Sequence, residues 1–158
     1  MNEALPGKPV SASRTELSVF MLPHHANPYG SIHGGVILMH MDSAAAMAAM
    51  RHCRANAVTV AMDYVHFLAP THVGELVTFK ASLNLVAKTS MEVGVRVEAE
   101  NLITGDIRHT GSAYLTFVVM DEHFRPAPAP PLLLETDEDR RHFRQAEERR
   151  AARLGCKA

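Results

Sequence analysis

A single carboxylate stands in the most apolar segment of this sequence of 158 residues. Asp42 lies in the run from Val36 to Arg51, whose other members are mostly Ala, Met, Leu and Ile. An unpaired carboxylate in an apolar environment is unfavourable by several kcal/mol unless it becomes protonated. Arg51 and Arg54 stand two or more helical turns away, too far along a helix to pair with it. Because perturbed acids concentrate at active sites, we interpret Asp42 as a general base or a nucleophile.

Two glycines begin the same segment, at a predicted helix start whose partial charge is opposite to that of the Asp42 carboxylate. Gly34 and Gly35 follow His33 at the start of a predicted helix, whose first N–H groups have no helical partner. These groups carry a partial positive charge of about half a unit, which favours the oxyanion of a carbonyl under attack. A tight turn into a crowded helix is the alternative interpretation of the two glycines. Their spacing fits neither a dinucleotide-binding loop nor a P-loop.

The spacing between Gly35 and Asp42 limits how the two residues can cooperate. Seven positions place them on one helix face, separated by roughly 10 Å along the axis. One carbonyl group cannot reach both from the same chain. If Asp42 is catalytic and the glycines bind the oxyanion, the site is shared between two copies at a dimer interface.

Other polar residues are candidates with two interpretations each. Asn27, in the loop before the glycines, either positions a water or a carbonyl, or is a turn residue. Lys88, Thr89 and Ser90 stand between two predicted strands and either form a hairpin turn or bind phosphate. The ten histidines and two cysteines lack the spacing of a zinc site, so we predict no metal and expect His33 only to shape the glycine loop.

The hydrophobic pattern predicts the elements that hold these residues. The segment from 36 to about 51 is a helix that is apolar nearly all round, so it must be buried on several sides. Residues alternate with period two in 58–67, 76–86, 91–100 and 107–120, after a first strand in 14–22. We expect an α+β fold in which one antiparallel sheet curls around the helix and its last four strands follow one another as a meander. The long edge of such a sheet favours a homodimer joined edge to edge.

The rest of the chain divides by composition. We expect a flexible N-terminus over 1–12, the folded domain over 13–122, a proline-rich linker over 123–135 and a charged helix over 136–155. Thr136 can cap that helix, acids fill its first turn, and arginines fill its last. The helix is either a solvated surface element or an arm that binds a partner or a nucleotide.

Charge and cysteine content exclude several classes of protein. A net charge of −1 argues against nucleic acid as the main partner. Two cysteines form no disulfide framework, and the first residues lack the apolar core of a signal peptide. Because no apolar run approaches the ~18 to 20 residues that span a bilayer, we expect a cytoplasmic protein without a membrane partner.

The sequence from about Leu22 to Pro131 resembles the hotdog-fold acyl-CoA thioesterases. The likeness is strongest to the cytosolic acyl-CoA hydrolase branch, which includes the vertebrate brain enzyme and the YciA-type bacterial enzymes. It rests on AN-x-x-G-x-x-HGG, on MD in the following helix, and on RHC, D-x-V-x-F, P-x-x-VGE and TSMEV. The sequence after residue 130 is also similar to the C-terminal extension of that family.

The resemblance implies a fold, a reaction and roles for particular residues. The fold is the hotdog fold, and the reaction is hydrolysis of a fatty acyl-CoA to a free acid and CoA, with no cofactor beyond the CoA of the substrate. Asp42 and Asn27 match the catalytic pair, which works across the subunit interface of a homodimer, often within a trimer of dimers. The amide of Gly35 would polarise the thioester carbonyl, with His33 and Gly34 beside the substrate. Lys88, Thr89 and Ser90 fall where members of the fold contact CoA.

Two other functions compete with hydrolysis. A non-catalytic hotdog module would bind acyl-CoA without turning it over, but it would need neither Asn27 nor Asp42. A hotdog hydratase acting on acyl thioesters is disfavoured because its Asp/His motif is missing.

Overall fold

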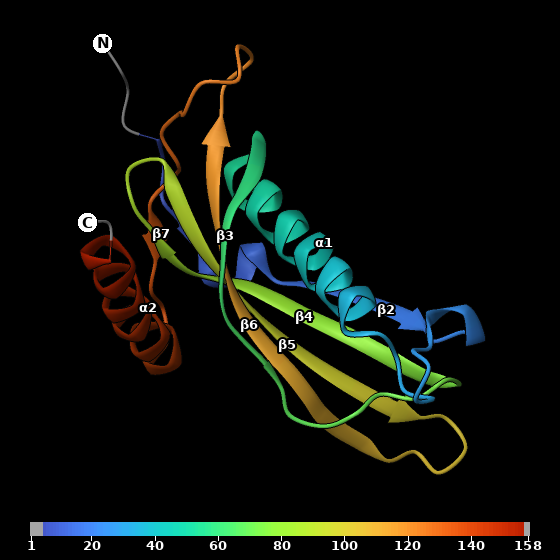
Figure 1. Cartoon of the computed structure of the whole chain (residues 1–158). Coiled ribbons are helices and arrows are strands. Elements are labelled where there is room, and N and C mark those ends of the chain that lie inside the picture. The colour runs from blue at the N-terminus through green and yellow to red at the C-terminus, as the bar shows by residue number, and fades with distance from the viewer. Residues whose placement is uncertain (1–4, 157–158) are drawn as a thin grey trace.

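A five-stranded antiparallel sheet with one long helix packed on it forms the centre of the computed structural model, which describes residues 5–156 (Figure 1). The sheet contains β2 (Thr15–Phe20), β3 (Asn56–Phe67), β4 (Glu75–Val86), β5 (Ser90–Asn101) and β6 (Ile107–Met120). The long helix is α1 (Gly34–Cys53), and the shorter elements are β1 (Lys8–Pro9), η1 (Val10–Ser13), η2 (Pro23–His25), β7 (Leu132–Leu133) and a C-terminal helix, α2 (Asp137–Gly155). The predicted hotdog architecture is confirmed.

Helix α1 packs closely on the sheet because its buried face consists largely of alanine. Ile37, Met41 and the alanines at 44, 45, 48 and 49 are buried against inward-facing residues of the strands. The opposite face, which we expected to be buried as well, exposes Met39 and Met50 to 56% and 43% in the single chain. An apolar helix face left open in one chain indicates a surface that another molecule covers.

The strand order differs from the predicted meander. Strands β4, β5 and β6 follow one another as antiparallel neighbours, but β3 pairs with β6 at the far edge, so the order is β2-β4-β5-β6-β3. The connection of residues 68–74 does not close a hairpin. It crosses the end of the sheet, where the N–H of Leu68 donates to the carbonyl of Thr110 (2.9 Å) and His72 forms a bridge with Ser31. Period-two alternation fixes which face a residue takes but not which strand lies beside it.

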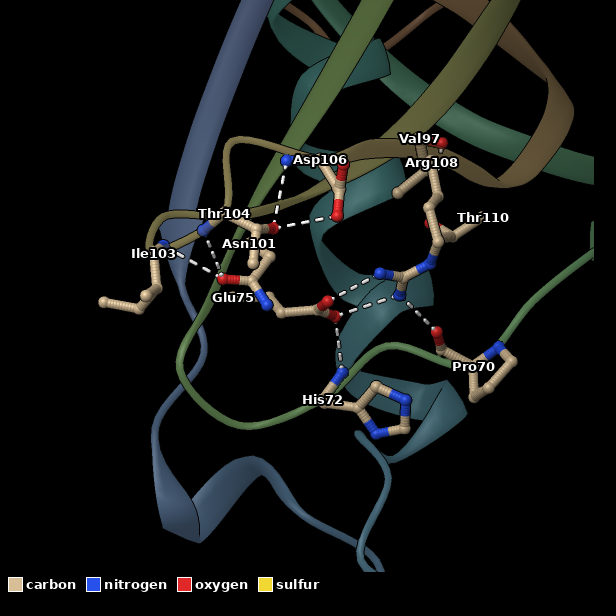
Figure 2. A network of polar contacts seen from close by, with 10 residues as sticks. All are labelled: Pro70, His72, Glu75, Val97, Asn101, Ile103, Thr104, Asp106, Arg108 and Thr110. Carbon is tan, nitrogen blue, oxygen red and sulfur yellow. Dashed lines mark hydrogen bonds and ion pairs between the residues drawn. The ribbon is translucent and has the colours of Figure 1, made fainter.

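An ion pair fastens this crossing connection to the sheet (Figure 2). The guanidinium of Arg108 donates to the buried carboxylate of Glu75 (2.7 Å) and to the carbonyl of Pro70 (2.9 Å). The same carboxylate accepts the N–H of His72 at 2.8 Å. Hydrogen bonding from Arg108 holds the pKa of Glu75 below its ordinary value. These bonds therefore hold residues 68–74 in place at this end of the sheet.

The two segments expected to be a flexible N-terminus and a linker meet in the structure. In the described part of 1–12, β1 pairs in parallel with β7, which lies within 123–135, and the N–H of Lys8 donates to the carbonyl of Pro131 at 2.9 Å. Val10, the residue that follows β1, is buried. Two-residue strands carry no alternation, so the sequence pattern could not predict them.

Helix α2 lies on the face of the sheet opposite α1 (Figure 1). As predicted, Thr136 caps it: its hydroxyl accepts the N–H of Asp139, whose carboxylate accepts the N–H of Thr136 in return. The guanidinium of Arg149 pairs with Glu92 of β5 at 2.7 Å, and Glu92 is only 3% exposed on its side chain. Arg149 also stacks over the ring of Tyr114, 3.6 Å from its centre. A buried ion pair therefore fixes this helix to the sheet. None of the helices within residues 5–156 is long and apolar enough to cross a membrane.

Replacing Arg149 with alanine is expected to lower the free energy of unfolding by about 3–5 kcal/mol, because it leaves the Glu92 carboxylate buried without its partner. Chemical denaturation followed by circular dichroism measures the loss. Arg141→Ala, on the exposed side of the same helix, should change stability by less than about 0.5 kcal/mol. Replacing both Glu92 and Arg149 with methionine should recover most of the loss. Equal effects of the two single substitutions would show that the buried pair has no special role.

Candidate functional site

Asp42 lies on the side of α1 that faces β3, and it is half-buried in the single chain. The hydroxyl of Thr59, near the start of β3, donates a hydrogen bond of 2.6 Å to Oδ1 of Asp42. No ion pair with Asp42 forms among residues 5–156, which agrees with the expectation that Arg51 and Arg54 are out of reach. The carboxylate is thus oriented by one hydroxyl and has its other oxygen available.

Strand β3 is an irregular edge strand. Its pairing with β6 shifts register between Thr59 and Ala61 and again between Asp63 and His66, where Tyr64 has a positive φ of 51°. Such bulges re-aim side chains and occur beside active sites. Val60 and Tyr64 expose 56% and 52% of their surface, although they belong to an apolar strand. The edge of β3 beside Asp42 is therefore open and apolar in the described chain.

The glycine-opened start of α1 is capped by a neighbouring imidazole. The N–H of Gly35 donates to Nδ1 of His33 at 2.9 Å, and a Cβ at position 35 would lie only 3.0 Å from that nitrogen. Gly34 faces the ring of Phe67 at the end of β3, with 3.5 Å between the ring and a Cβ built at Gly34. The predicted donor is present, but a substrate carbonyl would have to replace the exposed His33 ring to accept from Gly35.

Asn27 holds its own loop in place. Its Oδ1 accepts the N–H groups of Tyr29 (2.9 Å) and Ser31 (3.3 Å), and its Nδ2 donates to the hydroxyl of Ser31 (2.9 Å). Gly30 takes the positive φ of 87° that the turn requires. An amide nitrogen carries two hydrogens, so one remains for a water or a carbonyl after the bond to Ser31. Asn27 acts as a turn residue here and retains a donor.

Lys88 and Thr89 lie in the turn between β4 and β5, as the hairpin interpretation expects, and Ser90 is the first residue of β5. Ser90 pairs with Val118, the same residue that pairs with Val58 at the beginning of β3. Gly34 instead lies against Phe67, at the other end of β3. At a rise of about 3.3 Å per residue, these two ends of β3 lie roughly 30 Å apart. One chain therefore does not bring this turn to the helix start.

The structure sorts the predicted site residues into three groups. Asp42 joins Thr59. Gly34, between His33 and Gly35, meets Phe67 at the end of β3, and Asn27 lies in the loop before this helix start. The turn before Ser90 lies at the level of the beginning of β3. Within residues 5–156, no three His, Cys, Asp or Glu side chains come together in a way that could hold a metal ion. One chain thus contains the parts of a site without assembling them.

Comparison with known proteins identifies the family. The sequence model of the thioesterase superfamily matches residues 29–105. The Bacillus subtilis acyl-CoA thioester hydrolase YkhA, named as uncharacterized, is 35% identical over 119 residues, which cover 75% of this chain and 69% of that protein. A solved apo-hexameric acyl-CoA thioesterase superimposes with a TM-score of 0.92 at 35% identity, over 96% of this chain and 97% of the other. The chain belongs to the acyl-CoA thioesterase family.

Some relatives of this thioesterase are much longer. Mouse acyl-coenzyme A thioesterase 11 is 38% identical over 150 residues, but these cover 94% of this chain and only 25% of the mouse protein. A Staphylococcus aureus acyl-CoA hydrolase solved with butyryl coenzyme A, coenzyme A and coenzyme A disulfide has a TM-score of 0.86 at 28% identity, over 96% of this chain and 95% of that chain.

Variants of the Staphylococcus aureus enzyme draw attention to Thr59. Three further structures carry alanine in place of an asparagine, an aspartate or a threonine, at successive separations of 15 and 17 residues. In this thioesterase Asn27, Asp42 and Thr59 stand in the same order with the same separations. Asn27 and Asp42 stand out in the sequence, whereas Thr59 does not, because a threonine in a strand rich in β-branched residues is ordinary. The available signal was a hydroxyl between Val58 and Val60, within the apolar segment 57–62 of the strand.

Proposed function

We propose that this chain hydrolyses acyl-CoA thioesters to a free acid and CoA, at two equivalent sites that each use residues from two copies of the chain. The observation that carries the proposal is the separation within one chain. Asp42, oriented by Thr59, and the glycine start of α1 are the two halves of an acyl-transfer site, yet they lie too far apart along one helix to act on one carbonyl.

Pairing of two β3 edges would bring the halves together. Asp42 lies beside Thr59 of β3, and Gly34 lies beside Phe67 of the same strand. An antiparallel pair of β3 strands centred near Asp63, midway between those two residues, sets Thr59 of one copy beside Phe67 of the other. The same pairing covers the exposed methionine face of α1 and the apolar edge of β3. Two-fold symmetry then yields two identical sites.

The proposed reaction uses groups of the chain and one water. Asp42 accepts a proton from water, whose oxygen attacks the thioester carbonyl carbon. The resulting oxyanion accepts a hydrogen bond from the N–H of the partner's Gly35, whose own His33 gives way to the substrate. The remaining donor of the partner's Asn27, in the loop before that helix start, orients the water or the carbonyl. Collapse of the intermediate re-forms the carbonyl and breaks the C–S bond. The CoA thiolate takes the proton held by Asp42, so one water is consumed and acid and thiol are released.

The turn of Lys88, Thr89 and Ser90 supports binding of the CoA half of the substrate. Antiparallel β3 strands place this turn of one copy at the end where the partner's α1 begins. A cation and two hydroxyls suit phosphate oxygens. The hexameric relative favours a trimer of such dimers. Cytosolic acyl coenzyme A thioester hydrolases of rat, mouse and human, 30% identical over 142 residues, favour a cytoplasmic location.

Replacing Thr59 with valine should lower kcat about 10- to 100-fold with little change in KM, because a hydrogen bond to a charged group contributes about 1.5–3 kcal/mol. Thr59→Ser keeps the hydroxyl and should restore most of the activity, which a purely structural role in β3 would not require. Steady-state kinetics with one acyl-CoA measures both variants. Identical kcat for the valine and serine variants would remove Thr59 from the site.

Thiol release from a panel of acyl-CoAs tests the proposed function directly. We expect steady turnover that greatly exceeds the amount of enzyme. A binding module would instead show acyl-CoA affinity by calorimetry with no thiol released. A hydratase would consume an enoyl-CoA without releasing thiol.

A further inference from the structure

Two arginines, one turn apart on α2, reach adjacent strands of the sheet. Arg149 stacks over the ring of Tyr114 on β6, and Arg153 donates to Oδ2 of Asp63 on β3 at 2.9 Å. Asp63 and Tyr114 are direct partners in the pairing of β3 with β6, so helix α2 holds both strands from the same face. Between residues 5 and 156, no other side-chain hydrogen bond or ion pair links α2 to β3. The side chains of Arg153 and Asp63 are only 22% and 30% exposed, so the pair is partly shielded from water.

Asp63 is the last residue of β3 before a bulge in its pairing with β6. The register shifts between Asp63 and His66, where two residues of β3 lie opposite one residue of β6. The first of the two, Tyr64, has a φ of 51°, which is the left-handed conformation that glycine takes in one class of bulge. A residue with a large side chain is strained there, and surrounding contacts must hold it in place. The ion pair between Asp63 and Arg153 is such a contact, one residue away.

The bulge lies between the two positions on β3 that serve the proposed site. Thr59, which orients Asp42, precedes the bulge, and Phe67, which contacts the helix start, follows it. Because side chains of a strand alternate between faces, losing the extra residue of the bulge would turn Phe67 away from the helix. The proposed pairing of two β3 strands is centred near Asp63. The same bulge would therefore set where Asp42 of one copy lies relative to the start of α1 in the other.

We propose that Arg153 is a positioning residue for thioester hydrolysis, because its pairing with Asp63 holds the β3 bulge that relates the two halves of the shared site. The inference rests on the proposed function, since the two halves act together only in a site that two β3 strands complete. Its effect falls on kcat, because displacing reacting groups by about 1 Å can slow a reaction on the order of 100-fold. KM changes less, since the turn before Ser90 joins β4 to β5 and lies outside the bulge.

Steady-state kinetics with one acyl-CoA tests this role. Arg153→Ala should lower kcat about 10- to 100-fold and change KM less than about threefold. Arg153→Lys can still donate one hydrogen bond to Asp63 and should keep kcat within about threefold of the wild type. Arg140→Ala is the matched control, since it removes an ion pair of α2 with the fully exposed Asp137, and its kcat should stay within about twofold of the wild type.

Glycine at the strained position distinguishes support of the bulge from general stabilisation. Glycine adopts a φ of 51° without strain, so the bulge in Tyr64→Gly no longer depends on the ion pair. Adding Arg153→Ala to Tyr64→Gly should therefore lower kcat less than about threefold relative to Tyr64→Gly alone. An ion pair that only stabilises the fold would have the same effect on kcat with either residue at position 64.

The outcomes separate the positioning role from the proposed function. A folded Arg153→Ala protein with the kcat of the wild type would overturn the role of Arg153. An equal loss of kcat from Arg153→Ala with and without Tyr64→Gly would also overturn it. Absence of thiol release by the wild type from every acyl-CoA would instead overturn the proposed function. If Arg153→Ala does not fold by circular dichroism, Arg153→Met keeps the length of the side chain without its donors and takes its place, with the same expected results.

Discussion

Replacing Asp42 with asparagine is expected to lower kcat for acyl-CoA hydrolysis by about 10²- to 10⁴-fold while the protein folds normally. The amide is nearly isosteric with the carboxylate and can still accept the hydroxyl of Thr59, but it cannot take a proton from water. Asp42 is half-buried and forms no ion pair in the described range, so its replacement leaves no charged partner stranded. Thiol release measures the loss, and thermal unfolding verifies the fold.

A second acid-to-amide change provides the control for Asp42. Asp137→Asn alters a fully exposed acid in the first turn of α2 and should leave kcat within about twofold of the wild type. KM should change little in Asp42→Asn, because the carboxylate acts on the water rather than on the bound CoA. Near-wild-type kcat in a folded Asp42→Asn protein would remove Asp42 from the proposed mechanism.

The sequence pattern predicted the individual elements well. The four long segments with period two correspond to β3, β4, β5 and β6, and the apolar segment corresponds to α1, all with ends within about two residues. Alternation and helical periodicity are local properties, and the side chains of these elements obey them. The place of β3 beside β6 depends on how residues 68–74 cross the sheet, which is decided by contacts with Thr110 and Ser31 far along the chain.

The candidate site was predictable where a residue conflicted with its surroundings. An acid in an apolar helix stands out, and so do two glycines at a helix start, so Asp42 and Gly35 could be selected from sequence. The hydroxyl of Thr59 and the imidazole of His33 became visible only as hydrogen-bond partners of those residues. Each depends on a side-chain direction that no periodicity specifies.

The open edge of β3 accounts for a candidate site whose two halves lie apart in a single chain. Its exposed apolar residues, the open methionine face of α1 and the separated halves of the site all belong to β3 and α1. A second copy paired along β3 would satisfy all three at once. Catalysis would then require the dimer. A variant that blocks β3 pairing would lose activity without any change at Asp42.

The second large effect is the recovery of activity when two inactive variants are combined. In an Asn27→Ala chain paired with an Asp42→Asn chain, one shared site carries both substitutions and the other carries neither. Random pairing of equal amounts makes half of the dimers mixed, each with one intact site of two. The mixture should therefore recover about a quarter of wild-type activity, whatever larger assembly the dimers form.

This complementation is the most direct test of the shared site. The two variants are unfolded together in denaturant, refolded at equal concentrations and assayed by thiol release, beside each variant refolded alone. We expect about a quarter of the wild-type rate in the mixture and almost none in either variant, with the maximum at equal proportions. A mixture no more active than its parents, although mixed dimers form, would show that each chain assembles its own site and would contradict a site shared between two chains.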